Sequence, residues 1–178
     1  MRNPQTMAAA LAWTCAVLTT PLALGADISQ PPVTIELVDG GGFFGRLITG
    51  AASGDTFTDR YTFTTGGAAS VVADLFSYRG RTDGGVDITA MDLYSSAGTQ
   101  VASGTPVAAD GIEQWQLAAG GLAADTYQVL VSGNLNSSSP AVYSASLAVS
   151  AVPEPATMTM LLGGLLLIGA TRRRCKVQ

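Results

Sequence analysis

The chain has 178 residues, with 9 basic and 13 acidic side chains, two cysteines and no histidine. This length allows one domain of ordinary size, and the lack of histidine excludes the commonest metal and acid–base chemistry. Charged residues make up only 12% of the chain, whereas 47% of it is hydrophobic. The apolar residues are concentrated at the two ends, so the ends must be separated from the middle before a core is considered.

The N-terminal segment 1–25 has the order of a secretory signal peptide. Arg2 is its only charged residue, and a short apolar stretch leads to small residues. Signal peptidase needs small side chains at the third and first positions before the cut, and Ala23 and Gly25 supply both. The predicted mature N-terminus is therefore Ala26. The alternative is an uncleaved anchor helix, which the short and interrupted apolar run disfavours.

The C-terminal segment 151–178 combines a proline-rich start, an apolar stretch and a basic end. The 16 uncharged residues 156–171 would form a helix about 24 Å long, slightly shorter than a hydrocarbon core of about 30 Å. Pro155 fits the first turn of such a helix but not its interior. We therefore predict a transmembrane helix over 156–171 and a tail, 172–178, held in the cytoplasm by its basic residues, which are Arg172, Arg173, Arg174 and Lys176.

This order of parts resembles a known sorting signal. Val152-Pro153-Glu154-Pro155, followed by the apolar stretch and the arginine cluster, is similar to the PEP-CTERM signal of bacterial exported proteins. The resemblance implies recognition by exosortase, a membrane-embedded, transpeptidase-like protease that cuts near the Pro-Glu-Pro and releases the protein or transfers it to the cell surface. The two prolines agree with this role because they keep the segment extended. The alternative is a C-terminal anchor that is retained.

The 127 residues from 26 to 152 carry 4 arginines and 12 acidic residues, which gives a formal charge of −8. Both cysteines and the single lysine lie outside this segment, so no disulfide stabilises it. A chain of this length still buries roughly two thirds of its unfolded surface and should fold by packing alone. Its acidic surface argues against nucleic acid and anionic membranes as partners.

Residues 26–150 are predicted to form a single all-β domain, because apolar and polar residues alternate between Gly-rich and Ser-rich turns. In the segment 86–94 Ile88 and Ala90 are even-numbered whereas Leu93 is odd, which predicts a β-bulge. About eight short strands indicate a jelly-roll-like antiparallel β-sandwich. The expected strands are 33–38, 43–48 as a short partner or a covering loop, 57–64, 71–76, 86–94, 113–117, 127–131 and 141–149.

One of these strands places an acidic residue among aromatic residues. Phe57-Thr58-Asp59-Arg60-Tyr61 resembles the F-x-D-x-F signature of one group of PEP-CTERM proteins, with a tyrosine as the final aromatic residue. In a strand, Phe57, Asp59, Tyr61 and Phe63 point to one face, and a bare buried carboxylate is costly. Asp59 is therefore expected to have a structural role, accepting backbone N–H bonds or pairing with Arg46, Arg60, Arg79 or Arg81.

The segment 59–150 also resembles, more loosely, the closing half of bacterial pre-peptidase C-terminal domains. The similarity lies in Asp92-Leu93-Tyr94 and in the segments 96–99, 123–129 and 143–147. It implies the same class of β-sandwich.

No catalytic residue is predicted, because a serine nucleophile would lack a histidine or lysine base and no cleft is evident for a carboxylate pair. Asp83, Asp87 and Asp92 could bring oxygen ligands to a Ca²⁺ ion, but no calcium-loop spacing is met and a solvated acidic turn is favoured. No metal or cofactor is predicted. Asn136-Ser137-Ser138 fits the N-glycosylation pattern, and a flexible loop explains it equally well.

Together these patterns predict a secreted, exosortase-processed protein that has a structural or adhesive role in the exopolysaccharide or biofilm layer and is not an enzyme. The expected partners are signal peptidase and exosortase during processing, the inner membrane transiently, and extracellular polysaccharide. The alternatives are a carbohydrate-binding or calcium-binding module and a protein that stays anchored in the membrane.

Overall fold

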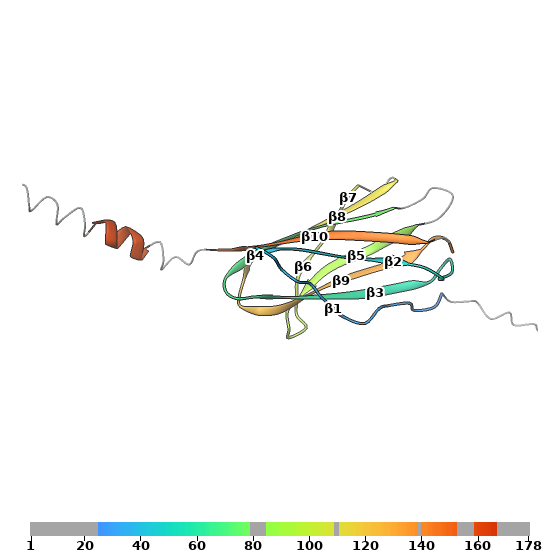
Figure 1. The fold of residues 1–178 in the computed structure, drawn as a ribbon, viewed down its shortest axis with the longest axis horizontal. Coiled ribbons are helices and arrows are strands. Elements are labelled where there is room, and N and C mark those ends of the chain that lie inside the picture. Colours follow the sequence, from blue (N-terminus) through green and yellow to red (C-terminus); the bar gives the residue numbers. More distant parts are fainter. Residues whose placement is uncertain (1–24, 79–84, 109–110, 139, 153–158, 167–178) are drawn as a thin grey trace, which may run out of the picture.

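The computed structural model describes residues 25–78, 85–108, 111–138, 140–152 and 159–166. Within these residues ten strands form two five-stranded sheets that pack face to face (Figure 1). The order is β1-β3-β9-β5-β6 in the first sheet and β2-β10-β4-β8-β7 in the second. The predicted all-β sandwich is thereby confirmed, with ten strands in place of about eight.

Most connections carry the chain from one sheet to the other, so neighbours in sequence are rarely neighbours in a sheet. The first sheet contains β1 (Val33–Thr34), β3 (Thr56–Thr65), β5 (Val86–Tyr94), β6 (Gln100–Ser103) and β9 (Asp125–Leu135). The second contains β2 (Gly41–Ile48), β4 (Ala69–Tyr78), β7 (Thr105–Ala108), β8 (Ile112–Leu122) and β10 (Ala141–Ala151). Among these strands only β1 and β3 pair in parallel.

The core lies between the sheets and is built by the alternation that predicted the strands. Every second side chain of the long strands is buried, with Val71, Leu75, Val129, Val131 and Leu147 at 2% exposure or less. Burying such side chains is the main favourable contribution to folding, at roughly 1.5 to 3 kcal/mol each. The domain therefore has an apolar core that needs no disulfide.

The predicted bulge in β5 is confirmed. The pairing of β5 with β9 shifts between Ile88 and Ala90. Ile88 is buried on one side of the shift, and Met91 and Leu93 are buried on the other. The extra residue returns the apolar side chains to the core after the change of parity.

The segment 33–38 differs from its prediction as one strand. Only Val33–Thr34 belong to a strand, and the chain then crosses to the second sheet through Asp39 and Gly40, which have φ values of 51° and 79°. A Cβ atom on Gly40 would lie 2.5 Å from the carbonyl oxygen of Val149, so this turn requires glycine. The next segment is a full strand, β2, that pairs with β10 and is not a covering loop.

The two terminal predictions fall largely outside the described residues. Segment 1–24 is not described, nor are Pro153, Glu154, Pro155 and the basic tail 172–178. Within the predicted span 156–171, residues 159–166 are helical, and no described helix has the length and apolar character to cross a membrane. The start of the described chain and the end of β10 lie at opposite ends of the sandwich (Figure 1).

Candidate functional site

A row of polar side chains crosses the inner face of the second sheet. Strand pairing places Arg46 of β2 opposite Tyr143 of β10, Tyr143 opposite Ser77 of β4, and Ser77 opposite Glu113 of β8. Such a row inside an apolar core is costly unless each polar group is hydrogen-bonded. No buried side-chain nitrogen or oxygen of the described residues lacks a partner.

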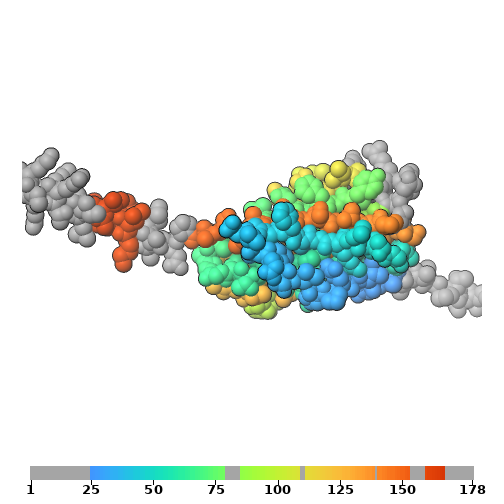
Figure 2. All heavy atoms as spheres, in the orientation of Figure 1, coloured from blue at the N-terminus to red at the C-terminus, as the bar shows by residue number. Residues whose placement is uncertain are grey.

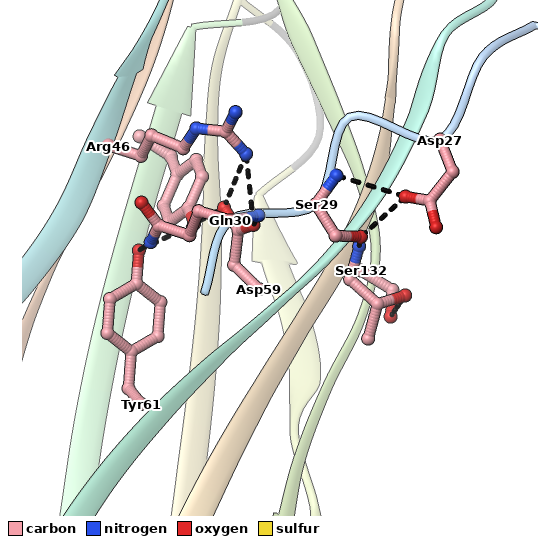
Figure 3. Close-up of polar contacts among 9 residues, drawn as sticks. Asp27, Ser29, Gln30, Arg46, Asp59, Tyr61 and Ser132 are labelled. Atoms are coloured by element: carbon pink, nitrogen blue, oxygen red, sulfur yellow. Dashed lines mark hydrogen bonds and ion pairs between the residues drawn. The ribbon is translucent and has the colours of Figure 1, made fainter. Parts of the chain in front are cut away.

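Asp59 of β3 projects from the first sheet onto one end of this row and is fully buried. Arg46 Nη1 donates to both of its carboxylate oxygens, at 3.0 and 3.2 Å, and the backbone N–H of Gln30 donates at 2.9 Å (Figure 3). The hydroxyl of Tyr143 donates to Oδ2. The expectation that Asp59 has a backbone N–H or arginine partner is thus confirmed, with Arg46 as the arginine; Arg60 is exposed, and Arg79 and Arg81 lie outside the described residues.

Two tyrosines extend this cluster, and their hydrogen-bond directions follow from their partners. Gln30 Nε2 donates to the Tyr61 hydroxyl at 2.8 Å, and the Tyr61 and Tyr143 hydroxyl oxygens are 2.7 Å apart. Because Tyr143 gives its proton to Asp59, Tyr61 must donate to Tyr143. The chain of donors therefore runs from Gln30 through both phenols to the carboxylate.

Both phenols of this cluster are held in the protonated form. Burial raises the pKa of Tyr143, and the hydrogen bond to Asp59 raises it further. Burial also raises the pKa of Tyr61, and the nearby negative charge of Asp59 acts in the same direction. Neither phenol can serve as a base near neutral pH.

The aromatic residues around Asp59 pack the two sheets against each other. The ring of Phe57 on β3 stacks on the ring of Tyr143 on β10, with 5.5 Å between the ring centroids.

A second buried carboxylate, Glu113, lies at the other end of the row and was not predicted as a site. It is 3% exposed. Its oxygens accept hydrogen bonds from Ser77 Oγ at 2.8 Å, from the backbone N–H of Ile88 at 3.0 Å and from Trp115 Nε1 at 2.9 Å. The signal that could have found it is the alternation in Glu113-Gln114-Trp115, which puts the acid on the same buried face as the tryptophan.

A third buried carboxylate, Asp55, was also missed. It is 7% exposed and lies just before β3. Its Oδ1 accepts the backbone N–H of Ala26 at 2.8 Å, and its Oδ2 accepts that of Ala52 at 2.7 Å. No sequence pattern points to it, because Asp55 follows a Gly-containing segment that resembles an ordinary turn.

The outer face of the second sheet exposes several large apolar side chains. Strand pairing puts Leu47 beside Val142 and Tyr78 beside Ile112; these four are between 49% and 66% exposed, and Phe43 is 84% exposed. Phe76 and Ser144 border two hollows of about 310 and 260 Å³ on this face. Exposed apolar patches of this kind mark interaction sites.

The residues considered for calcium binding and glycosylation do not form a site within the described part of the chain. Asp87 and Asp92 lie five residues apart on β5, roughly 16 Å at about 3.3 Å per residue, and Asp83 lies outside the described residues. In the described part of the chain no group of three His, Cys, Asp or Glu residues could hold a metal ion. Asn136 is exposed just after β9. Glycosylation at this residue remains a prediction.

The described chain thus forms a β-sandwich module followed directly by a separate C-terminal segment. A family model described as the PEP-CTERM protein-sorting motif matches residues 151–174, which confirms the resemblance found in the sequence. The motif indicates an exported protein that exosortase processes and sorts to the cell surface. Of the motif's first residues, Ala151 ends β10, and the N–H of Val152 donates to the carbonyl of Ala68 at 2.9 Å.

Solved structures that are similar to the sandwich include two bacterial proteins. One is PliG of Aeromonas hydrophila, a periplasmic inhibitor of g-type lysozyme, at 15% identity and a TM-score of 0.38, covering 70% of this chain and 100% of that chain. The other is the pre-peptidase C-terminal domain of a Bacillus anthracis collagenase, the type of domain expected from the sequence, at 16% identity and a TM-score of 0.34, covering 67% and 92%. No curated protein matches the chain. At these TM-scores neither structure informs the function.

Proposed function

We propose that the protein is cut by signal peptidase ahead of Ala26, held transiently in the inner membrane by the segment 156–171, and cut by exosortase near Pro153 to Pro155. The released sandwich then acts as a structural or adhesive protein, without enzymatic activity, in the exopolysaccharide layer at the cell surface. The observation that supports this proposal best is the sorting motif at 151–174, which begins where the last strand ends.

The position of that junction suits processing after folding. Ala151 still pairs with Ala69 of β4, and Val152 is the last described residue before the prolines. A cut in the Pro-Glu-Pro stretch therefore removes no residue from any of the described strands. Among the described residues every buried polar side-chain atom has a hydrogen-bond partner, which supports a domain that remains folded outside the cell without disulfides.

Intact-mass measurement of the protein from culture, cell-surface and membrane fractions tests the proposal. The expected mature species begins at Ala26 and ends between Pro153 and Pro155. Replacing both Pro153 and Pro155 by alanine should leave the uncut species in the membrane fraction, whereas Pro31→Ala, at an exposed position outside the motif, should be processed normally. A mature protein that still carries Arg172 to Arg174 would identify it as membrane-anchored.

A second candidate function, binding of a neutral polysaccharide, is supported by the apolar outer face of the second sheet. Aromatic rings there alternate with small hydroxyl side chains, and both hollows border Ser144. Rings with a polar rim are suited to sugars, which present both C–H faces and hydroxyls. Asp74 is a charged residue on this face; it lies opposite Ser146 and Gln116 in the strand pairing, and Gln116 donates to its carboxylate at 3.1 Å.

Co-sedimentation with the host's insoluble exopolysaccharide tests this second function. The triple variant Phe43→Ser, Phe76→Ser and Tyr78→Ser should lose at least about tenfold in affinity, equivalent to about 1.4 kcal/mol. Tyr94→Ser, on the outer face of the first sheet, is the matched control and should bind like the unmodified protein. Equal binding by the triple variant would reject this face as the binding site.

A further inference from the structure

We infer that the sandwich contains a preformed receptor for its own mature N-terminus, in which the carboxylate of Asp55 binds the α-ammonium group created by cleavage ahead of Ala26. The inference rests on the proposed export, because signal peptidase must make that cut. It goes beyond export in assigning a binding role to a carboxylate that the sorting motif does not involve.

The geometry at Asp55 already fits an ammonium group. Its Oδ1 lies 2.8 Å from the backbone nitrogen of Ala26, and its Oδ2 is occupied by the N–H of Ala52. Before cleavage the nitrogen of Ala26 is an amide and forms an ordinary hydrogen bond. After cleavage the same atom carries a positive charge, so the contact becomes a charge-assisted hydrogen bond, which is shorter and roughly twice as strong.

The charge of Asp55 is otherwise uncompensated among the described side chains. Among the described residues the ion pair joins Arg46 to Asp59. The donors to Asp55 are two backbone N–H groups, those of Ala26 and Ala52. A carboxylate that is 7% exposed without a cation is unfavourable. Cleavage would supply the missing cation at the correct distance.

The neighbouring carboxylate, Asp27, does not compete for the new charge. Ser29 donates to its Oδ1 from both the hydroxyl, at 2.6 Å, and the backbone N–H, at 3.0 Å. These bonds hold the pKa of Asp27 below its usual value. The carboxylate of Asp27 therefore already has its hydrogen-bond donors within the local turn 27–29.

Main-chain pairing fixes the nitrogen of Ala26 independently of its charge. The N–H of Thr56 donates to the carbonyl of Ala26, and the N–H of Ile28 donates to the carbonyl of Thr56, both at 2.9 Å. Residues 26–28 therefore run parallel to the start of β3, and in Figure 2 this blue segment lies along the lower edge of the domain. A preorganised partner binds without a further cost of ordering.

The residue on the other side of the cut is constrained as well. A Cβ atom on Gly25 would lie 1.7 Å from the carbonyl oxygen of Gly54, so in the folded, uncut chain only glycine fits here. Signal peptidase accepts alanine at this position, but the fold of the precursor does not. Gly25→Ala is thus a useful control, because cleavage removes the substitution and leaves an unchanged mature protein.

Amine acylation of the exported protein tests the inference. A chain that begins at Ala26 contains only two primary amines, its α-amine and Lys176, and peptide mass spectrometry separates them. With an N-hydroxysuccinimide ester at neutral pH, the α-amine should react about tenfold more slowly in the folded protein than in urea, the change that one pKa unit would give. Lys176, or an added lysine peptide where exosortase has removed the tail, is the reference amine and should show no such protection.

Two variants distinguish the ion pair from simple burial of the N-terminus. Asp55→Asn keeps the shape of the side chain and should raise the acylation rate toward the value in urea. A chain prepared with one extra serine ahead of Ala26 displaces the ammonium group, and in it Asp55→Asn should change the rate by less than about twofold, within the noise of such a comparison. Gly25→Ala should give the rate of the unmodified mature protein.

Each failure has its own meaning. A mature N-terminus other than Ala26, found by intact mass, would overturn both the proposed cleavage and the receptor. A chain that begins at Ala26 but whose α-amine reacts equally fast in the folded and unfolded states would overturn the receptor alone. Equal effects of Asp55→Asn in the native and serine-extended chains would likewise overturn it.

Discussion

Asp59 and Glu113 lie at the two ends of one polar row, yet their charges are handled differently. Asp59 has a cation, Arg46, within 3.0 Å, together with a backbone N–H and a phenol. Glu113 has three neutral donors and no salt bridge within the described part of the chain. Hydrogen bonds can thus satisfy the oxygens of a buried carboxylate without neutralising its charge, and the two sites should respond differently to substitution.

The largest effect is expected from Asp59→Ala. The variant leaves the guanidinium of Arg46 and the N–H of Gln30 without their acceptor, so the free energy of unfolding should fall by about 3 to 5 kcal/mol. Urea denaturation measures it, with Glu36→Ala at an exposed position as the control, expected within about 0.5 kcal/mol of the unmodified protein. A stable Asp59→Ala protein that no longer attaches to cells or polysaccharide would instead make Asp59 a functional residue.

Arg46→Met should leave Asp59 like Glu113, as a buried carboxylate that has neutral hydrogen-bond donors but no cation. The methionine fills part of the same space, and the carboxylate keeps only the neutral donors Gln30 and Tyr143. Because Arg46 is 19% exposed at its side chain, we expect a loss of about 2 to 3 kcal/mol, less than for removing Asp59 itself. If Arg46→Met is as stable as the unmodified protein, neutral donors alone suffice at both sites.

Tyr143→Phe should cost about 2 kcal/mol, because it removes a hydrogen bond to a charged group, and should also alter the dependence on pH. The raised pKa values of Tyr61 and Tyr143 mean that the folded chain keeps protons that the unfolded chain loses above pH 10. Stability is therefore complete below the ordinary tyrosine pKa of 10.0 and falls above it, by about 1.4 kcal/mol per pH unit for each such tyrosine.

Urea titrations at several pH values between 9 and 11 test this prediction. The unmodified protein should lose stability more steeply above pH 10 than Tyr143→Phe, which has one buried phenol fewer. Parallel curves would show that Tyr143 ionises equally readily in both states.

Glu113→Gln should have a smaller effect, about 1 to 2 kcal/mol. The amide oxygen can still accept from Ser77 and Ile88, but the NH₂ group then faces the indole N–H of Trp115, so two donors meet. Trp115→Phe removes that second donor, and the double variant should regain part of the loss. A cycle of urea midpoints measures the coupling, and its absence would mean that the Trp115 bond contributes nothing.

The smallest effect is expected from EDTA or a reductant on the mature domain, which has no cysteine. Neither should lower the melting temperature by more than about 4 °C, the change that about 1 kcal/mol would produce in a domain of this size. A larger fall with EDTA alone would indicate that calcium binds in the region of Asp83 to Asp92.

Part of the site could be predicted because it depends on a local period. The alternation in 57–63 was enough to predict that Asp59 is buried among aromatic residues and that its carboxylate needs a hydrogen-bonding or ionic partner. The sequence could not show which of the four arginines pairs with Asp59. Arg46 does so because β2 packs against β3 and does not form a hairpin with 33–38. Asp55 was missed for the same reason, since its partner Ala26 lies 29 residues away and pairs through main-chain bonds that leave no pattern in side chains.

The sequence by itself determined the strand periodicity, the bulge in β5 and the sorting motif, since each is set by residues close together in the chain. Only the tertiary structure decided which strands pair, which carboxylates are buried together and which outer face is apolar. Tyr143 and Asp59 are 84 residues apart, and they meet because β10 and β3 lie in facing sheets. Hydrogen bonding between strands depends on backbone groups that every residue shares, so pairing is settled by the packing of the whole core and cannot be read from any one segment.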